Sequence, residues 1–404
     1  MTKFVSTRFA STALIVLLPA LVRAQSAPML RAHVEFLASD SMEGRACPSR
    51  SCDLAADYIL AHFRAAGLET QVQTTEAVFE VRRGETVVHL KEAQLKTPAL
   101  YANTKVQLDP DQNILAGKEV ILDKTPELEP IYNATGDIFI THIPAGLRNV
   151  IGVLKGRDRK LRETYVLVTA HYDHVGLKPD GEGDLVFNGA NDNASGVAGL
   201  IEIARAIASS ATRPRRSLAF IAYFGEERGM VGSRYYAQHP IVPVAQTFAQ
   251  VNFEQLGRPD DSEGPRVKGA TVTGWDRSLV GQTLATAATP FGVRIYKHEK
   301  FSEVFFERSD NEALAKLGVP AHTISVAYGF PDYHGLGDEA SKLDYTNMAI
   351  VTKALRRGVM ALANRVTSLT PRAGSPAVSV PKVGSSPASP NPKRSRPSPK
   401  SPKS

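Results

Sequence analysis

Runs of apolar residues alternate with amphipathic stretches through the second half of the chain. Short β-branched runs at 150–154, 165–170 and 217–224 predict buried strands, and 194–208 between the last two has apolar residues at helical spacing. The same helical spacing returns from Asp344 to about Arg365. Strands that alternate with helices favour a parallel sheet covered on both faces. We therefore predict a three-layer α/β/α fold with a mixed, mostly parallel sheet.

The first half is less regular. Residues 53–66 have the spacing of an amphipathic helix that ends before Gly67. From 70 to 148 only short β-rich pieces such as 77–81 and 86–90 stand out, which predicts a small insertion or a β-rich elaboration. We expect 25–69 and 149–370 to form one domain around this segment.

The two ends have distinct compositions. Lys3 and Arg8 precede an apolar stretch at 13–21, and the small residue Ala24 offers a cleavage site, so 1–24 is predicted to be a secretory signal peptide. An uncleaved anchor is the alternative. No later stretch approaches the roughly 20 apolar residues of a membrane helix. We expect a secreted or periplasmic protein without a membrane span.

Charge is distributed unevenly along the chain. The formal net charge is +7, yet 371–404 contains seven basic residues, many Ser and Pro, and no acid, which predicts a disordered tail. The segment 25–370 has 38 basic against 41 acidic residues. The folded part therefore has no basic excess that would favour nucleic acid, although the tail could contact an anionic envelope surface.

The chain has two cysteines, Cys47 and Cys52. In an exported protein, this pair predicts a disulfide that closes a tight surface loop, with two free thiols as the alternative. The spacing is not that of a Cys-x-x-Cys redox motif.

Acidic and imidazole side chains recur close to the ends of the predicted strands. Oxygen and imidazole ligands without thiolate suit divalent ions, and the two histidines favour zinc. A short carboxylate such as Asp192 is well suited to bridge two ions. One such residue alone is usually structural, but five in local contexts of this kind predict a two-metal hydrolase. The five are His171, Asp192, Glu227, Glu254 and His334.

The chain resembles a metallopeptidase of the M28 family, of the aminopeptidase Y and leucyl aminopeptidase type, from about His33 to about Arg365. The resemblance implies a fold of the zinc-exopeptidase, phosphorylase/hydrolase-like kind. It is carried by HVEFLASDSMEGR (33–45), AADYILAHFRAAGLE (55–69), HYDHVG (171–176), NDNASGVAGLIEIARA (191–206), GEERGMVGSRYYA (225–237) and YHGLGDE (333–339).

The resemblance implies two zinc ions per chain that share Asp192. His171 and Glu254 would complete one set of ligands, Glu227 and His334 would complete the other, and Glu226 would be the general base. Most members have Asp where this chain has Glu254. Because Glu serves at the equivalent place in the related M20 peptidases, we expect a ligand here. The alternative is a surface Glu beside a site that holds one ion.

Neighbouring residues are interpreted from their positions. Glu226 lies next to Glu227, so one can face the ions while the other reaches a water molecule. Asp173, two residues after His171, is placed to accept a hydrogen bond from the second ring nitrogen of that histidine. His174 is expected to be structural or to orient a ligand, and His322 to be a core histidine.

The predicted function is an exopeptidase acting on peptides, most consistent with an aminopeptidase. Alternatives are a carboxypeptidase, a glutaminyl-peptide cyclotransferase on the same fold, and a catalytically inactive binding protein. Glu43 or Asp310 could attract a substrate α-amine, and Arg308 is the basic residue that could clamp a terminal carboxylate. The substrate pocket is expected from the loops at 301–310 and 327–333.

Overall fold

The computed structural model describes residues 26–76 and 145–370, and the backbone of six strands between 78 and 143. The predicted signal peptide at 1–24 and the predicted tail at 371–404 lie outside the described residues. Within the described part, no helix combines the length and the apolar character needed to cross a membrane.

The main sheet has eight strands in the order β1-β8-β10-β9-β11-β16-β14-β15. The four central strands β10, β9, β11 and β16 run parallel, whereas β1, β8 and β14 form antiparallel pairs. The predicted mixed, mostly parallel sheet is therefore confirmed. The strands are β1 Glu69–Thr74, β8 Arg148–Leu154, β9 Tyr165–His171, β10 Ser217–Tyr223, β11 Thr247–Glu254, β14 Gly269–Val272, β15 Arg294–Tyr296 and β16 Ala321–Ser325.

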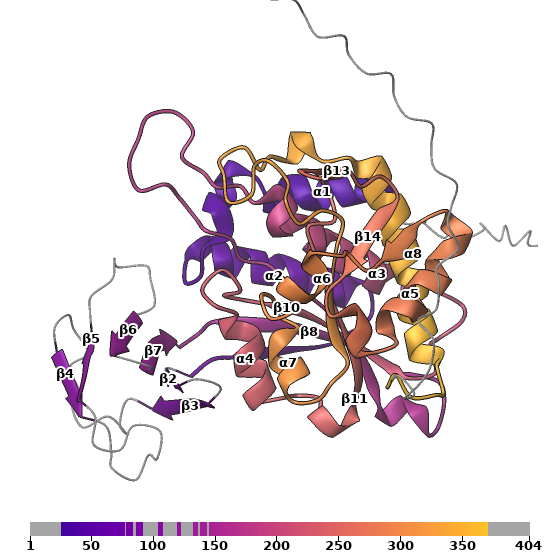
Figure 1. Ribbon diagram of the computed structural model, residues 1–404, viewed down its shortest axis with the longest axis horizontal. Coiled ribbons are helices and arrows are strands. Elements are labelled where there is room, and N and C mark those ends of the chain that lie inside the picture. The colour runs from indigo at the N-terminus through magenta and orange to yellow at the C-terminus, as the bar shows by residue number, and fades with distance from the viewer. Residues whose placement is uncertain are drawn as a thin grey trace, which may run out of the picture. The chain divides into compact units, whose positions relative to one another are not determined.

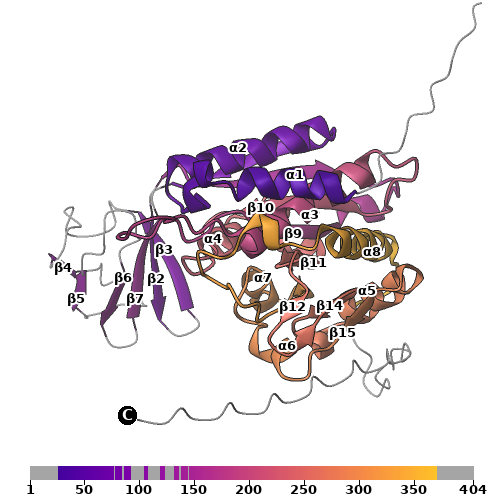
Figure 2. The same ribbon diagram turned by 90° about the horizontal axis from the view of Figure 1, so that it is seen from above.

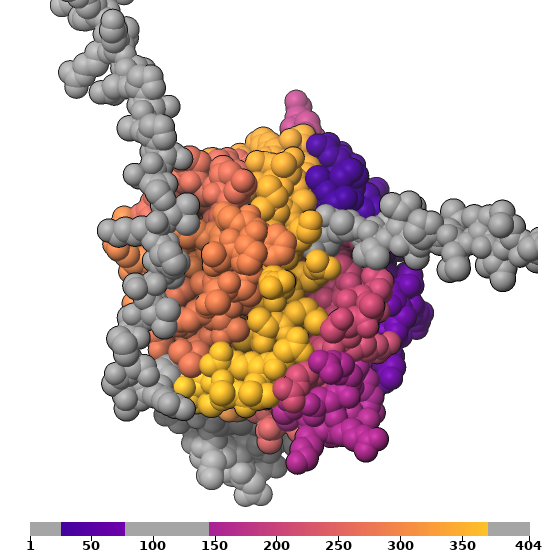
Figure 3. Space-filling view, turned by 90° about the vertical axis from the view of Figure 1, so that its right-hand side faces the viewer, coloured from indigo at the N-terminus to yellow at the C-terminus, as the bar shows by residue number. Residues whose placement is uncertain are grey.

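Helices cover both faces of this sheet (Figures 1 and 2). Alternate residues of each strand point to opposite faces; in β9, Val166 and Val168 join one core while Leu167 joins the other. The first core includes α1 Ala27–Leu37, α2 Arg50–Ala65, α3 Gly196–Ala208, α5 Val280–Ala288 and α8 Tyr345–Asn364. The second core includes Tyr236 of α4 Val231–Gln238 and Leu314 of α7 Glu312–Lys316, whereas Val231 and Tyr235 of α4 belong to the first core. A short helix α6 spans Phe301–Val304. Figure 3 shows the yellow surface of α8 beside the orange surface that includes α5.

The predicted elements are present with small shifts at their starts. Helix α2 begins at Arg50, three residues before the predicted start, because the Ser49 side chain accepts a hydrogen bond from the Cys52 amide and caps it. Helix α3 begins at Gly196, because 190–195 forms an irregular turn. Helix α8 follows Asp344, whose side chain caps it at the Asn347 amide.

The β-rich segment between β1 and β8 forms sheets of its own. Because β1 belongs to the main sheet, this segment starts after Thr74 and ends before Arg148. A four-stranded antiparallel sheet has the order β3-β2-β7-β6, and β4 pairs with β5; a separate short hairpin later in the chain pairs β12 with β13. These strands are β2 Val78–Arg83, β3 Thr86–Lys91, β4 Thr104–Gln107, β5 Glu119–Leu122, β6 Tyr132–Thr135, β7 Ile138–Ile143, β12 Asp260–Asp261 and β13 Gly264–Pro265.

Cys47 and Cys52 form a disulfide. The loop that it closes reaches the surface at Arg50, whereas each cysteine is itself only 2% exposed and belongs to the larger core. The Cys52 sulfur lies 3.7 Å from the Tyr172 hydroxyl. The bridge therefore packs against Tyr172, the residue between His171 and Asp173.

Candidate active site

The candidate residues gather at the carboxyl ends of the central parallel strands. His171 is the last residue of β9 and Glu254 the last of β11, and Glu226 follows the end of β10. Helix α3 after β9 packs into the first core, whereas α4 after β10 places Tyr236 in the second core, on the other face of the sheet. Open α/β sheets bind their ligands at the carboxyl ends of the strands, at the point where successive helices switch from one face of the sheet to the other.

A second carboxylate, that of Asp338, fixes the backbone at Asp192. The side chain of Asp338 accepts hydrogen bonds from the backbone amides of Asn191 and Asp192, each at 2.9 Å. The Asn191 side chain in turn accepts from the amides of Gly257 and Arg258 after β11. The irregular turn at 190–195 is therefore fixed to two neighbouring loops, which sets the direction of the Asp192 carboxylate.

The two oxygens of Asp192 face two different histidines. Oδ1 lies 3.4 Å from Nε2 of His171, and Oδ2 lies 3.4 Å from Nε2 of His334. His334 Nε2 is also 3.0 Å from Glu227 Oε2, and His171 Nε2 is 3.9 Å from Glu254 Oε1. The five residues therefore form two groups of donors that share Asp192.

This donor set fits divalent ions. Ligands of one tetrahedral zinc ion, with bonds of about 2.0–2.2 Å, stand about 3.3–3.6 Å from one another. The observed separations of 3.0–3.9 Å bracket that spacing, and the longest is the one to Glu254. All five side chains are oxygen or imidazole donors, and four of them are largely buried.

Electrostatics also favour a cation at this place. Burial raises the pKa of Glu254 to about 8 and raises that of Glu226 well above its usual value. Burial also opposes ionisation of Asp192, yet contacts with His171 and His334 hold its pKa below the usual range. For His334, the neighbouring Asp192 and Glu227 outweigh burial and raise the pKa to about 10. Several carboxylates this close together are stabilised by positive charge between them.

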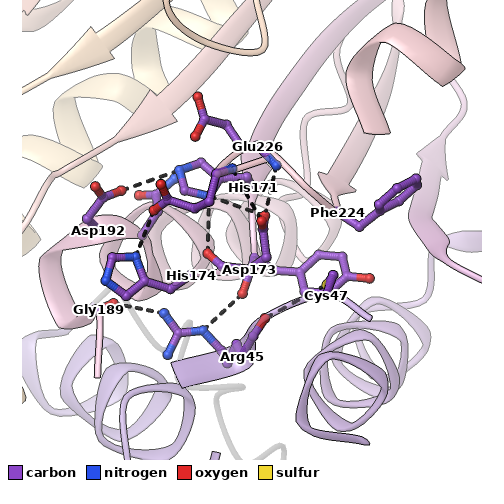
Figure 4. A network of polar contacts seen from close by, with 12 residues as sticks. Arg45, Cys47, His171, Asp173, His174, Gly189, Asp192, Phe224 and Glu226 are labelled. Atoms are coloured by element: carbon purple, nitrogen blue, oxygen red, sulfur yellow. Dashed lines mark hydrogen bonds and ion pairs between the residues drawn. The ribbon is translucent and has the colours of Figure 1, made fainter. Parts of the chain in front are cut away.

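Asp173 contacts both His171 and the Glu226–Glu227 pair (Figure 4). Its carboxylate accepts hydrogen bonds from the amides of Glu226 at 3.1 Å and Glu227 at 3.3 Å. Nδ1 of His171 lies 3.2 Å from the backbone oxygen of Asp173 and 3.5 Å from its carboxylate. Asp173 thus fixes the turn after β10 as well as the ring of His171, a double role that the sequence did not suggest.

His174 lies within the cluster. Its Nδ1 is 2.7 Å from Glu227 Oε1, the oxygen opposite the one that faces His334. Donor atoms of His174, Asp192, Glu227 and His334 all lie within 4.8 Å of one another. His174 therefore orients Glu227. His322 is buried between the backbone oxygen of Thr273 and the hydroxyl of Ser278, as expected of a core histidine.

A cavity of about 430 Å³ opens beside Glu226 and Glu254. The predicted pocket loops contribute Phe305, Arg308, Ser309, Tyr328 and Tyr333 to its lining, and Gln255, Thr273 and Thr323 complete it with the site residues His171 and Asp192. Glu43 and Asp310 are not among the described residues that line it; Glu43 is exposed and Asp310 is fully buried.

Arg45 is a buried cation beneath the site (Figure 4). Its guanidinium donates to the backbone oxygens of Tyr172, Asn188 and Gly189 at 2.7–2.9 Å, and also to that of Leu37. Burial lowers the pKa of Arg45 to about 10. The arginine thus ties the loop after β9 to the turn that presents Asp192. In the sequence, the feature that could have pointed to this residue is the Gly44-Arg45 pair at the end of the 33–45 motif.

Arg45→Met should destabilise the fold. The methionine fills part of the volume but leaves buried carbonyl groups without donors, so we expect a loss of about 3 kcal/mol or more in the free energy of unfolding. Urea unfolding measures this loss. Arg64→Met, on the exposed side of α2, should change the same quantity by less than about 0.5 kcal/mol. Equal effects of the two substitutions would contradict a clamping role for Arg45.

The comparisons with known proteins agree with this geometry. The chain is 38% identical over 92 residues to aminopeptidase YwaD of Bacillus subtilis, which is 23% of this chain and 18% of that protein. Matches to the first curated relatives cover 27% or less of the relatives' own length.

Two solved structures show the same fold at low identity. BSAP, a zinc aminopeptidase from Bacillus subtilis, aligns with a TM-score of 0.55 at 19% identity, covering 83% of this chain and 94% of that one. The glutaminyl cyclase of Porphyromonas gingivalis aligns with a TM-score of 0.54 at 16% identity, covering 82% and 97%.

The model of peptidase family M28 matches residues 149–359, which contain the whole set of predicted ligands and Glu226. That match covers more than half of the chain, and it confirms the resemblance seen in the motifs. The chain belongs to peptidase family M28.

Proposed function

We propose that this protein is an exported, metal-dependent aminopeptidase that uses two zinc ions and Glu226 as the general base. The single observation that carries the two-metal proposal is the direction of the Asp192 carboxylate, whose two oxygens face His171 and His334 separately. A carboxylate that bridges two ions needs this arrangement. Export rests on the composition of residues 1–24.

In this proposal His171, Asp192 and Glu254 would hold one ion, and Asp192, Glu227 and His334 would hold the other. Zinc bound there would supply Lewis-acid chemistry, namely polarisation of the scissile carbonyl and a lowered pKa of water that makes it a nucleophile at neutral pH. His174 and Asp173 hold Glu227 and His171 in orientation. Orienting partners of this kind commonly alter metal affinity or activity 10- to 100-fold when removed.

Glu226 is assigned the proton transfer. Its carboxylate lines the cavity, while its backbone amide is fixed by Asp173. As base it takes a proton from the attacking water, and as acid it returns a proton to the leaving amine. A purely binding protein has no need of such a residue, which argues against a catalytically inactive role.

An acidic group at the cavity suits a free α-amine. Glu226 lines the cavity and is not one of the proposed metal ligands, and the curated relative YwaD is named an aminopeptidase. The substrates would then be peptides with an unblocked amino terminus.

Acetylating the amino terminus of a good pentapeptide substrate should therefore abolish cleavage, because the amide has no positive charge to offer. Amidating its carboxyl terminus, several residues away from the scissile bond, should change kcat/KM by less than about threefold. Mass spectrometry of the products measures both. The opposite pattern would assign the protein as a carboxypeptidase.

Glutaminyl cyclisation is the second candidate, because a glutaminyl cyclase shares the fold. A cyclase would convert an amino-terminal Gln peptide to a pyroglutamyl product of the same length and release ammonia. The aminopeptidase proposal predicts free glutamine and a shortened peptide, and mass spectrometry separates the two results.

A further inference from the structure

The lining of the cavity contains two chemically different sets of residues. One set consists of the metal-ligand candidates and Glu226, and the other includes Phe305 and Tyr328, whose rings stack with centroids 4.9 Å apart and an interplanar angle of 5°.

Arg308 is an exposed residue beside this aromatic pair. Its guanidinium carbon lies 5.6 Å from the centroid of the Phe305 ring, within the range of a cation–π contact. Arg308 is the one lysine or arginine among the described residues that line the cavity. Apart from this ring contact, its guanidinium has no hydrogen-bond or ion-pair partner within the described part of the chain. Its N–H groups face solvent and can be taken up by a substrate.

Gln255 adds a second unused polar group to the same lining. The residue is only 7% exposed, and its side-chain oxygen is buried without a hydrogen-bond partner. A buried amide left unpaired costs free energy unless a ligand or water completes it. Since the oxygen and nitrogen of a glutamine amide can exchange places by a flip, Gln255 can donate as well as accept.

A planar guanidinium meets a carboxylate through two parallel hydrogen bonds, and a carboxamide can add a third donor. We propose that Arg308, assisted by Gln255, binds a carboxylate of the substrate. The inference rests on the proposed peptidase function and names the substrate class. The carboxylate would be the side chain of an acidic amino-terminal residue or the free carboxyl terminus of a dipeptide.

Two substrate pairs distinguish these sources. Aspartyl and asparaginyl p-nitroanilide differ in the side-chain carboxylate, whereas Leu-Ala and Leu-Ala amide differ in the terminal one. Leucyl p-nitroanilide, which has neither, reports whether the enzyme is active. The zinc-loaded full-length mature protein is compared with Arg308→Gln, Arg308→Lys and the control Arg162→Gln, which removes one charge at the exposed turn before β9.

In Arg308→Gln, the charged-to-neutral ratio of kcat/KM should fall by roughly 10- to 100-fold for one substrate pair, mainly through KM. A fall for the aspartyl pair assigns the side-chain source, and a fall for the Leu-Ala pair assigns the terminal source. Arg308→Lys should retain part of the preference, Gln255→Met should weaken it, and Arg162→Gln should leave it unchanged.

Unchanged ratios for both pairs in Arg308→Gln, with leucyl p-nitroanilide still cleaved normally, would overturn the inference and leave the aminopeptidase proposal standing. No cleavage of leucyl p-nitroanilide by the zinc-loaded wild-type protein, with no release of free leucine from Leu-Ala, would instead contradict the proposed function itself.

Discussion

Glu226→Gln should lower kcat by about 10²- to 10⁴-fold, the usual contribution of a positioned general base. The amide keeps the size and polarity of the side chain but cannot take the proton from water. Because the substitution changes no proposed metal ligand, the zinc content should stay at the wild-type value. Steady-state kinetics and elemental analysis of the same preparation measure both quantities.

Glu163→Gln is the matched control, since that glutamate is exposed before the start of β9 and far along the strand from the site. It should leave kcat unchanged. Near-normal turnover by Glu226→Gln would assign the base to another group, and parallel loss of zinc would show that Glu226 is a ligand.

Asp192→Asn should have the largest effect, with loss of measurable activity and of most bound zinc. The substitution preserves shape, but a neutral amide does not replace a carboxylate that faces both His171 and His334. Removing the charge should therefore weaken the binding of both ions, whereas removing a ligand that belongs to one set should weaken the binding of one ion. Isothermal titration of the metal-free protein with zinc measures this difference.

Asp180→Asn, an exposed aspartate in the loop after β9, provides the control for amide substitution and should bind zinc normally. If Asp192→Asn still bound two ions with wild-type affinity, Asp192 would not be the shared ligand. Circular dichroism of the variant checks that the fold is retained.

The parts of the fold that the sequence predicted are those with strong periodicity. The apolar runs of β8, β9 and β10 are buried on both faces, so their composition alone marks them as central strands. Helix boundaries differed from the predicted ones where a side-chain cap sets the start of the helix, as with the Ser49 cap of α2. The burial of the Cys47–Cys52 bridge could not be predicted, because it depends on packing against Tyr172, about 120 residues later.

In the candidate site, too, residues at predicted strand ends could be placed from the sequence, whereas residues that act on distant loops could not. Residues at strand ends come together because parallel strands bring their carboxyl ends to one edge, so His171 and Glu254 could be placed in advance. Asp338 and Arg45 could not, since each acts on backbone groups of a distant loop and neither lies at a strand end. The unpaired state of Arg308 is likewise visible only once the loops around it are placed.

The metal content of the mature protein tests the two-metal proposal most directly. Elemental analysis after zinc loading and removal of excess metal should find close to two zinc ions per chain. Glu254→Ala should retain about one, because Asp192, Glu227 and His334 remain in place. A single ion in the wild-type protein, unchanged by Glu254→Ala, would contradict the two-metal site.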